Sequence, residues 1–319
     1  MDSLFNKLRE VKDNRKGQGK KYSLASILRL LFVSKLCGYT DIKGAWAMFG
    51  RLHPKQRYSL GFRRHDTLSY SGLVDIVSSI HVESLESVLL DVGSHIFGNA
   101  GTSFPLDGKS IRASRGSKGD PYHMVSLFCK NLSSVISQVK SQRGGGEVTA
   151  ALSLLQTMDL RGKIITADAM YTQRELCKLI TERGGHYIMP VKENQSELLH
   201  QVKHVFRTNP WDCQVGQYAE PLQKSHGRLE QRSIETLSWL HNHRKDGFGS
   251  IKQVAKITRY REILKTGEVS VASDYIITDL STSSITPKQL LYYNRDHWSI
   301  ENLSHRERDI VFNEDRNNF

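Results

Sequence analysis

The sequence predicts an α/β protein: a mixed β-sheet covered by helices, preceded by an all-helical region and interrupted by a strand-rich segment. Three observations support this fold class. Up to about residue 99, apolar residues recur at helical spacing. From about residue 100, apolar runs and amphipathic stretches follow the order strand, strand, strand, helix, strand, helix, strand, helix. From about residue 208 to 284, strand-like runs return, joined by polar loops.

The 319-residue chain has the composition of a globular protein and is strongly basic. Its 38% hydrophobic residues suffice to bury a core and exclude a disordered chain. The 45 Lys and Arg residues exceed the 33 Asp and Glu residues and give a formal charge of +12. Such a surplus favours a polyanionic partner, because cations near phosphates release condensed counterions. On charge alone, a basic enzyme that binds no nucleic acid is equally consistent.

No membrane segment or secretion signal is expected. The most apolar stretch, Leu24 to Leu36, contains Arg29 and Lys35 and is too short to span a bilayer. The first residues lack the apolar core of a signal peptide. The four cysteines are far apart, which predicts neither a zinc site nor a disulfide framework. We therefore expect a protein of the reducing cytoplasm.

Each element follows from local signals. In the first region, Ser23 is expected to cap a helix that begins at Leu24, and Asp66 or Thr67 to cap a helix that begins near Leu68. In the second region, the expected strands are Phe104 to Gly108, His123 to Cys129, Ser134 to Val139, Ile164 to Ala167 and His186 to Val191. The expected strands of the third region are Leu229 to Leu237, Lys252 to Thr258 and Val269 to Thr278. A final helix starts near Thr286 and Pro287.

Three acidic residues stand at chemically useful positions. Asp107 ends the first expected strand, Asp168 ends the fourth, and Glu301 lies on the final helix. Each has an ordinary explanation when taken alone: a turn, a helix cap and a surface glutamate. Together, converging carboxylates can hold two hard cations about 4 Å apart, which stabilise an in-line displacement at phosphorus. Mg²⁺ suits that role because it takes oxygen ligands.

Several short motifs resemble one known family. These motifs are D-G-K-x-x-R (Asp107 to Arg112), T-x-D-A-x-x-x-Q (Thr166 to Gln173), Y-I-M-P-V-K-E-N-Q (Tyr187 to Gln195), H-G-R-x-E-x-R (His226 to Arg232), H-W-x-I-E-N (His297 to Asn302) and F-x-E-D (Phe312 to Asp315). They resemble, in family order and over nearly the whole chain, bacterial insertion-sequence transposases of the H-repeat-associated type.

The resemblance implies a fold, a reaction and partners. The fold would be an RNase H-like sheet with flanking helices, interrupted by a β-rich insertion. Asp107, Asp168 and Glu301 would be the DDE acids and would bind Mg²⁺ or Mn²⁺, as a pair of ions. The reaction would be hydrolysis of phosphodiester bonds at the ends of a mobile element and strand transfer into target DNA. The partners would be double-stranded DNA, with terminal inverted repeats, and further copies of the chain on DNA in the nucleoid.

The same resemblance divides the chain and assigns DNA contacts. Residues 1–99 would bind DNA or assemble the protein, 100–207 and 285–319 would form the catalytic domain, and 208–284 the insertion. The basic residues around the motifs, each of which could also be an ordinary surface charge, are candidate DNA contacts: Lys109, Arg112, Lys192, Arg228, Arg232, Arg295 and His297.

The sequence also departs from the family. Gly144 to Gly146 replace a K-S-N sequence, and Ser304, Arg306 and Arg308 occupy positions that are apolar in the family. The chain ends at Phe319, where family members continue. We therefore expect a shortened C-terminus. Two alternatives stay open: a weak or inactive relic that only binds DNA, and an RNase H-like nuclease without strand transfer.

Overall fold

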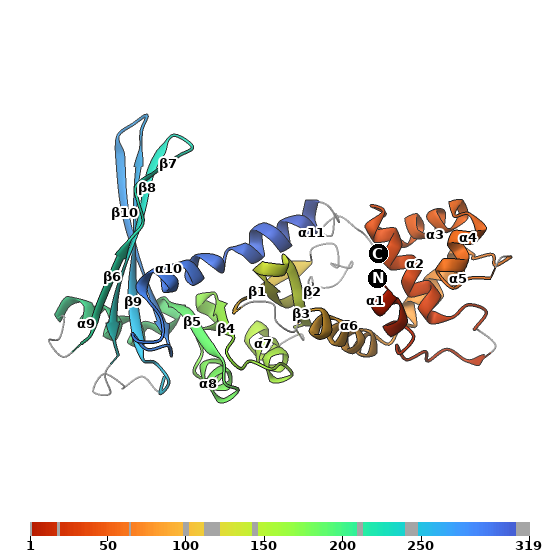
Figure 1. Ribbon diagram of the computed structural model, residues 1–319, viewed down its shortest axis with the longest axis horizontal. Helices are drawn as coiled ribbons and strands as arrows, with labels where there is room; N and C mark the ends of the chain where they lie inside the picture. The colour runs from red at the N-terminus through yellow and green to blue at the C-terminus, as the bar shows by residue number, and fades with distance from the viewer. Residues whose placement is uncertain are drawn as a thin grey trace. The chain divides into compact units, whose positions relative to one another are not determined.

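The computed structural model describes residues 2–17, 20–63, 65–97, 102–111, 122–141, 146–208, 213–239 and 248–310. The chain forms two compact units (Figure 1). The first unit consists of Met1–Asn99, Ser110–Tyr122 and Ser304–Phe319, and the second of Ala100–Lys109 and His123–Leu303. Arg112 and the motif from Phe312 to Asp315 lie outside the described residues. Within the described ranges, no helix is long and apolar enough to cross a membrane.

The N-terminal residues form helices, as their apolar spacing predicts. The described helices are α1 (Asp2–Lys7), α2 (Leu24–Leu36), α3 (Ile42–Arg51), α4 (Pro54–Ser59), α5 (Tyr70–Ser78) and α6 (Val82–Phe97). Ser23 caps α2, as predicted, by accepting a hydrogen bond from the Ser26 amide. The prediction for α5 is wrong, because Ser69 provides its cap. The Asp66 carboxylate accepts a hydrogen bond from the Arg63 amide, so it stabilises the preceding turn.

A single mixed sheet forms the centre of the second unit. Its first five strands are β1 (Ser103–Ile111), β2 (Tyr122–Cys129), β3 (Ser134–Lys140), β4 (Ile164–Ala167) and β5 (His186–Val191). They lie in the order β3-β2-β1-β4-β5, with β1, β4 and β5 parallel and β2 antiparallel to β3. This arrangement is RNase H-like, so the predicted fold class, a mixed α/β sheet with flanking helices, is confirmed.

Helices cover both faces of the central strands. One face packs against α7 (Gly146–Gln156), α8 (Arg174–Glu182) and α9 (Ser196–Thr208), and the other against α10 (Pro287–Asp296). Because successive strand residues point to opposite faces, Ile165 joins the first core and Ile164 the second. The central strands are therefore apolar on both sides, and a carboxylate at their ends is held by a rigid frame.

The segment after α9 forms strands that extend the same sheet. These strands are β6 (Val215–Ala219), β7 (Gln223–Ser225), β8 (Arg228–Ser238), β9 (Gln253–Ile263) and β10 (Glu268–Thr278). β10 pairs antiparallel with β5, and β9, β8 and β6 follow outward, with β7 also on β8. In Figure 1, β8, β9 and β10 extend beyond the helices as a long ribbon. The strand-rich segment is thus continuous with the central sheet.

The final helix begins as the sequence predicts. Thr286 caps α10 and forms a capping box with Gln289, and Pro287 occupies the first turn. After α10, the backbone forms the π-helical turn η7 (Glu301–His305) and then α11 (Arg306–Ile310). Glu301 therefore stands at a change of helical winding, and such π-helical turns are frequent at functional sites.

Candidate active site

Asp107 and Asp168 lie side by side at the same end of two central strands. β1 and β4 are parallel, and Leu106 lies opposite Ala167. The residue that follows each of these two is one of the aspartates. Contrary to expectation, β1 does not end at Asp107 but continues to Ile111, which excludes a simple Asp-Gly turn. Asp168 stands at the cap position of the 3₁₀ turn η4 (Ala169–Tyr171), but its carboxylate makes no capping hydrogen bond. Neither ordinary explanation accounts for these two residues.

Glu301 lies near enough to Asp107 to affect the pKa of its carboxyl. Its side chain is exposed at the start of η7. The pKa of Asp107 is raised to about 6, mainly because its carboxylate is buried, and the charges of Asp168 and Glu301 raise it further. A backbone hydrogen bond from Gly108 and the charge of His297 act in the opposite direction. The three acids that were predicted from the sequence therefore interact electrostatically.

His297 lowers the pKa of Asp168. Its Nε2 atom lies 3.5 Å from Asp168 Oδ1, and its Nδ1 atom lies 3.4 Å from Thr166 Oγ1. The pKa of Asp168 is lowered first by the hydrogen bond from His297, and the charge of Lys192 lowers it further. The environments of the two aspartates thus push their pKa values in opposite directions, a pattern that is common at functional sites.

The run Lys192 to Gln195 packs against the backbone that follows Asp168. Asn194 Nδ2 donates a hydrogen bond to the Ala169 carbonyl over 2.6 Å, and Gln195 Nε2 donates to the Thr172 carbonyl over 2.9 Å. These two amides tie the turn η5 (Glu193–Gln195) to the backbone that follows Asp168. Lys192, exposed at the end of β5, is thereby brought close to the Asp168 carboxylate.

The donor set suits a hard divalent cation. Carboxylate oxygens are the preferred ligands of Mg²⁺ and Mn²⁺, and a cation would offset both the burial of the Asp107 carboxylate and the repulsion from Asp168 and Glu301 that raise its pKa. Among the described residues, however, no three His, Cys, Asp or Glu side chains are close enough together to hold a metal ion. The charges of Asp168 and Glu301 affect Asp107, but the described side chains do not form a complete set of metal ligands.

Four of the predicted DNA contacts differ in exposure and in their ion pairs. Lys109 is buried, at 7% exposure, and does not lie on the surface. Arg232 and Arg295 both pair with Glu220, so part of their charge is neutralised within the protein. Arg228 is exposed at the start of β8.

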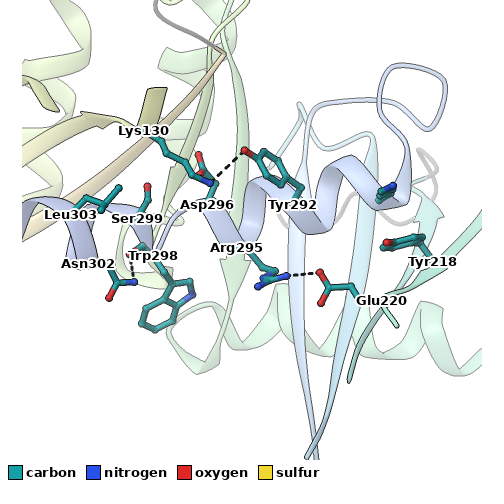
Figure 2. Close-up of a pocket in the computed structure, with 11 residues that line it drawn as sticks. Lys130, Tyr218, Glu220, Tyr292, Arg295, Asp296, Trp298, Ser299, Asn302 and Leu303 are labelled. Carbon is teal, nitrogen blue, oxygen red and sulfur yellow. Dashed lines mark hydrogen bonds and ion pairs between the residues drawn. The ribbon is translucent and has the colours of Figure 1, made fainter. Parts of the chain in front are cut away.

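A pocket that was not predicted lies along α10. It has a volume of about 450 Å³ and combines basic and aromatic side chains with Glu220, Asp296 and small polar residues (Figure 2). The basic residues are Lys130, Lys288 and Arg295, and the aromatic residues are Tyr218, Tyr292 and Trp298. Lys130 Nζ lies 2.8 Å from Asp296 Oδ1 and 4.9 Å from the centre of the Tyr292 ring.

A periodic signal in the sequence could have revealed this pocket. Tyr292, Arg295, Asp296, Ser299 and Leu303 follow the spacing of one helical face, and that face is polar and aromatic. The pocket surface ends within one helical turn of Glu301.

Comparisons with known proteins show which family the chain belongs to. The transposase DDE domain family matches residues 101–319, more than half of the chain. An uncharacterised protein from the dhlA 3′ region of Xanthobacter autotrophicus is 32% identical over 81% of this chain and 88% of its own length. The "Putative transposase YncI" of Escherichia coli O157:H7 is 28% identical over 99% of this chain and 81% of its own length.

A third relative, the "H repeat-associated putative transposase YhhI" of Escherichia coli K12, is 30% identical over 66% of this chain and 56% of its own length. A solved piggyBac transposase synaptic complex with hairpin DNA aligns over 96% of this chain and 63% of its own, at 10% identity and a TM-score of 0.42, too loose a likeness to support an argument. The family match and the relatives lead to one conclusion: the chain belongs to the transposase DDE domain family, as a bacterial transposase similar to the H repeat-associated type.

Proposed function

We propose that this transposase hydrolyses a phosphodiester bond at each end of a mobile DNA element and joins the freed 3′-hydroxyl to target DNA. The observation that carries the proposal is the position of Asp107 and Asp168, each directly after the paired residues Leu106 and Ala167 of two parallel strands, with Glu301 close enough to raise the pKa of Asp107. Three carboxylates without a nucleophilic side chain among them suit a reaction in which water or a DNA hydroxyl attacks phosphorus.

Asp107, Asp168 and Glu301 would hold Mg²⁺ or Mn²⁺, as a pair of ions. When bound, the metal would supply charge that stabilises the attacking and leaving oxygens. The protein's own contribution is to lower the pKa of Asp168 through the hydrogen bond from His297 and to hold Asp107 within β1, which continues on both sides of it. The match of donor chemistry and charge supports this assignment.

DNA would run over the basic residues beside these acids. Lys192 lies next to Asp168, and the pocket along α10 adds Lys130 and Lys288 with exposed Trp298. Arg228 would contact a phosphate from the outer ribbon. Two element ends must be held together for strand transfer, so we also propose that further copies assemble on DNA in the nucleoid, with residues 1–99 taking part.

The test is cleavage of DNA that carries the repeats flanking the gene, with Mg²⁺ or Mn²⁺. Wild type is compared with Asp168→Asn and with the control Asp159→Asn, which removes an exposed carboxylate whose salt bridge is with Arg161. We expect metal-dependent cutting by wild type and by the control, and loss of cutting in Asp168→Asn. Cutting that survives Asp168→Asn would mean that the active site is elsewhere.

The same assay separates the alternatives. Joined products from a labelled 3′ end distinguish a transposase from a nuclease that does not transfer strands. Binding without cutting by wild type would indicate a DNA-binding relic. One observation favours that reading: the π-helical turn that begins at Glu301 contains buried Ser304 and is followed by exposed Arg306, at positions where family members carry apolar residues.

A further inference from the structure

A fourth carboxylate, Glu147, lies beside Gly108, which follows Asp107, and beside Tyr171, which follows Asp168 by three residues. It belongs to the first turn of α7, on the segment that follows β3. Its Oε2 atom accepts a hydrogen bond from the Tyr171 hydroxyl over 3.0 Å, and its Oε1 atom lies 3.4 Å from His123 Nδ1. The side chain is 24% exposed, so the carboxylate is largely enclosed by these partners.

On one side, Glu147 contacts the residue that follows Asp107. A Cβ atom at position 108 would lie 2.7 Å from Glu147 Cδ and 3.0 Å from the Tyr171 hydroxyl. These distances are too short for any residue but glycine unless the carboxylate moves. Gly108 therefore lets the Glu147 carboxylate pack directly against the backbone of β1 next to Asp107.

On the other side, Glu147 reaches the residue that follows Asp168 by one turn. Tyr171 is fully buried, and its amide donates a hydrogen bond to the Asp168 carbonyl over 2.9 Å. Burial raises the pKa of the Tyr171 hydroxyl, and the charges of Glu147, Asp107 and Asp168 raise it further. The hydroxyl thus stays protonated and donates to Glu147.

The contacts join the two chain segments that carry Asp107 and Asp168, in addition to the β1–β4 pairing. A charge-assisted hydrogen bond in a buried site is strong, and removal of either partner leaves a buried polar group without its bond. We propose that Glu147 is a positioning residue that fixes the spacing of Asp107 and Asp168, through Gly108 and Tyr171, so that both can bind the same metal centre. This inference rests on the proposed function and extends it.

Another explanation must be separated from this one. A glutamate in the first turn of a helix also stabilises that helix through the helix dipole. In that case Glu147 would affect the stability of α7 but not the affinity of the aspartates for metal. The test therefore needs a metal-binding readout beside thermal stability.

The experiment measures Mn²⁺ binding by calorimetry, without DNA, together with the melting temperature and the Mg²⁺ concentration that gives half-maximal cleavage. The variants are Glu147→Ala, Tyr171→Phe and Gly108→Ala, each of which breaks the bridge at a different atom. Glu175→Gln, an exposed acid in the first turn of α8, is the matched control. Glu147→Asp shortens the side chain and retains the charge.

We expect Glu147→Ala to weaken Mn²⁺ binding by about 10- to 100-fold, the range seen when residues that orient metal ligands are lost. Tyr171→Phe and Gly108→Ala should weaken binding in the same direction, Glu147→Asp should be intermediate, and Glu175→Gln should match wild type. Half-maximal cleavage should require correspondingly more Mg²⁺ in the first three variants.

Wild-type affinity for Mn²⁺ in Glu147→Ala or in Tyr171→Phe would overturn the proposal, even if the melting temperature falls. Wild-type protein that binds Mn²⁺ but cuts no DNA would overturn the proposed function alone, because the positioning role is measured by binding. Wild-type protein that binds no Mn²⁺ would overturn both.

Discussion

The inner and outer strands of the sheet differ in where their charged side chains lie. Inner strands β1 and β4 are packed on both faces, and Asp107 sits there with a pKa raised to about 6. On the outer strands, charges pair at the surface, as Arg259 does with Asp274 over 2.6 Å and Arg261 with Glu230 over 3.1 Å. Charge on the inner strands is costly and lies at the proposed reaction site, whereas charge on the ribbon is exposed to solvent and paired at the surface.

The largest difference in stability is expected between core positions of the two regions. Ile165→Ala in β4, a fully buried position, should lower the free energy of unfolding by about 2–5 kcal/mol, because a cavity is left in the core. Val271→Ala in β10, an exposed position, should change it by less than about 0.5 kcal/mol. Urea denaturation measures both. Equal losses would mean that the ribbon is packed as tightly as the centre.

Asp107→Asn, unlike Ile165→Ala, is expected to raise stability, because the Asp107 carboxylate is buried. Its folded pKa of about 6 exceeds the ordinary 3.8, so the folded state binds the proton more tightly than the unfolded chain. Stability is therefore lost as the pH rises from about 4 to above 6, by on the order of 3 kcal/mol at pH 7.5. Asp107→Asn should recover this loss in urea denaturation across that pH range.

The Asp107 comparison has an internal control. Metal-free wild type should lose stability relative to Asp107→Asn on going from pH 4 to pH 7.5, and Mg²⁺ should stabilise wild type more than the variant. A constant difference between the two proteins at all pH values would contradict the raised pKa.

A smaller effect is expected on the outer ribbon. Arg228→Ala should weaken DNA binding by about 1 kcal/mol and reduce the dependence of log affinity on log salt by about one, because one phosphate contact is lost. Arg259→Ala, whose guanidinium pairs with Asp274, is the matched control and should change the salt dependence less. Fluorescence anisotropy at several salt concentrations measures both. An unchanged slope for Arg228→Ala would remove this residue from the DNA path.

Local signals in the sequence predicted much of the fold. Ser23 and the Thr286–Pro287 pair mark the helix starts that the structure has, because capping depends on residues adjacent in sequence. The apolar runs of the central strands also predicted their positions. The predicted strand ended at Thr258, whereas β9 continues to Ile263. Arg259, Tyr260 and Arg261 are polar there because the ribbon is largely exposed, so the apolar pattern ends before the strand does.

Less of the candidate site was predictable. The spacing and motifs predicted Asp107, Asp168 and Glu301 as the acids of the site, and in the structure Asp168 and Glu301 both affect the pKa of Asp107. The sequence could not show that Lys109 is buried, nor that Glu220 forms ion pairs with Arg232 and Arg295, because burial and these ion pairs depend on tertiary packing.

Glu147 was missed for the same reason. Its partners Gly108 and Tyr171 are far from it in the sequence. The Asp107-Gly108 pair was interpreted as a turn, so the sequence did not indicate that a glycine is needed next to the Glu147 carboxylate.

The central claim is that a glutamate from the final helix acts with two aspartates from the sheet. The most direct measurement is metal-dependent cleavage of element-end DNA by Glu301→Gln, beside Asp168→Asn and the control Glu307→Gln, an exposed acid on α11. We predict that Glu301→Gln and Asp168→Asn both lose on the order of 10³-fold or more in rate, since residues that act as a unit fail together, while Glu307→Gln cuts like wild type. Wild-type cleavage by Glu301→Gln would contradict the account, because the three carboxylates would then not form one site.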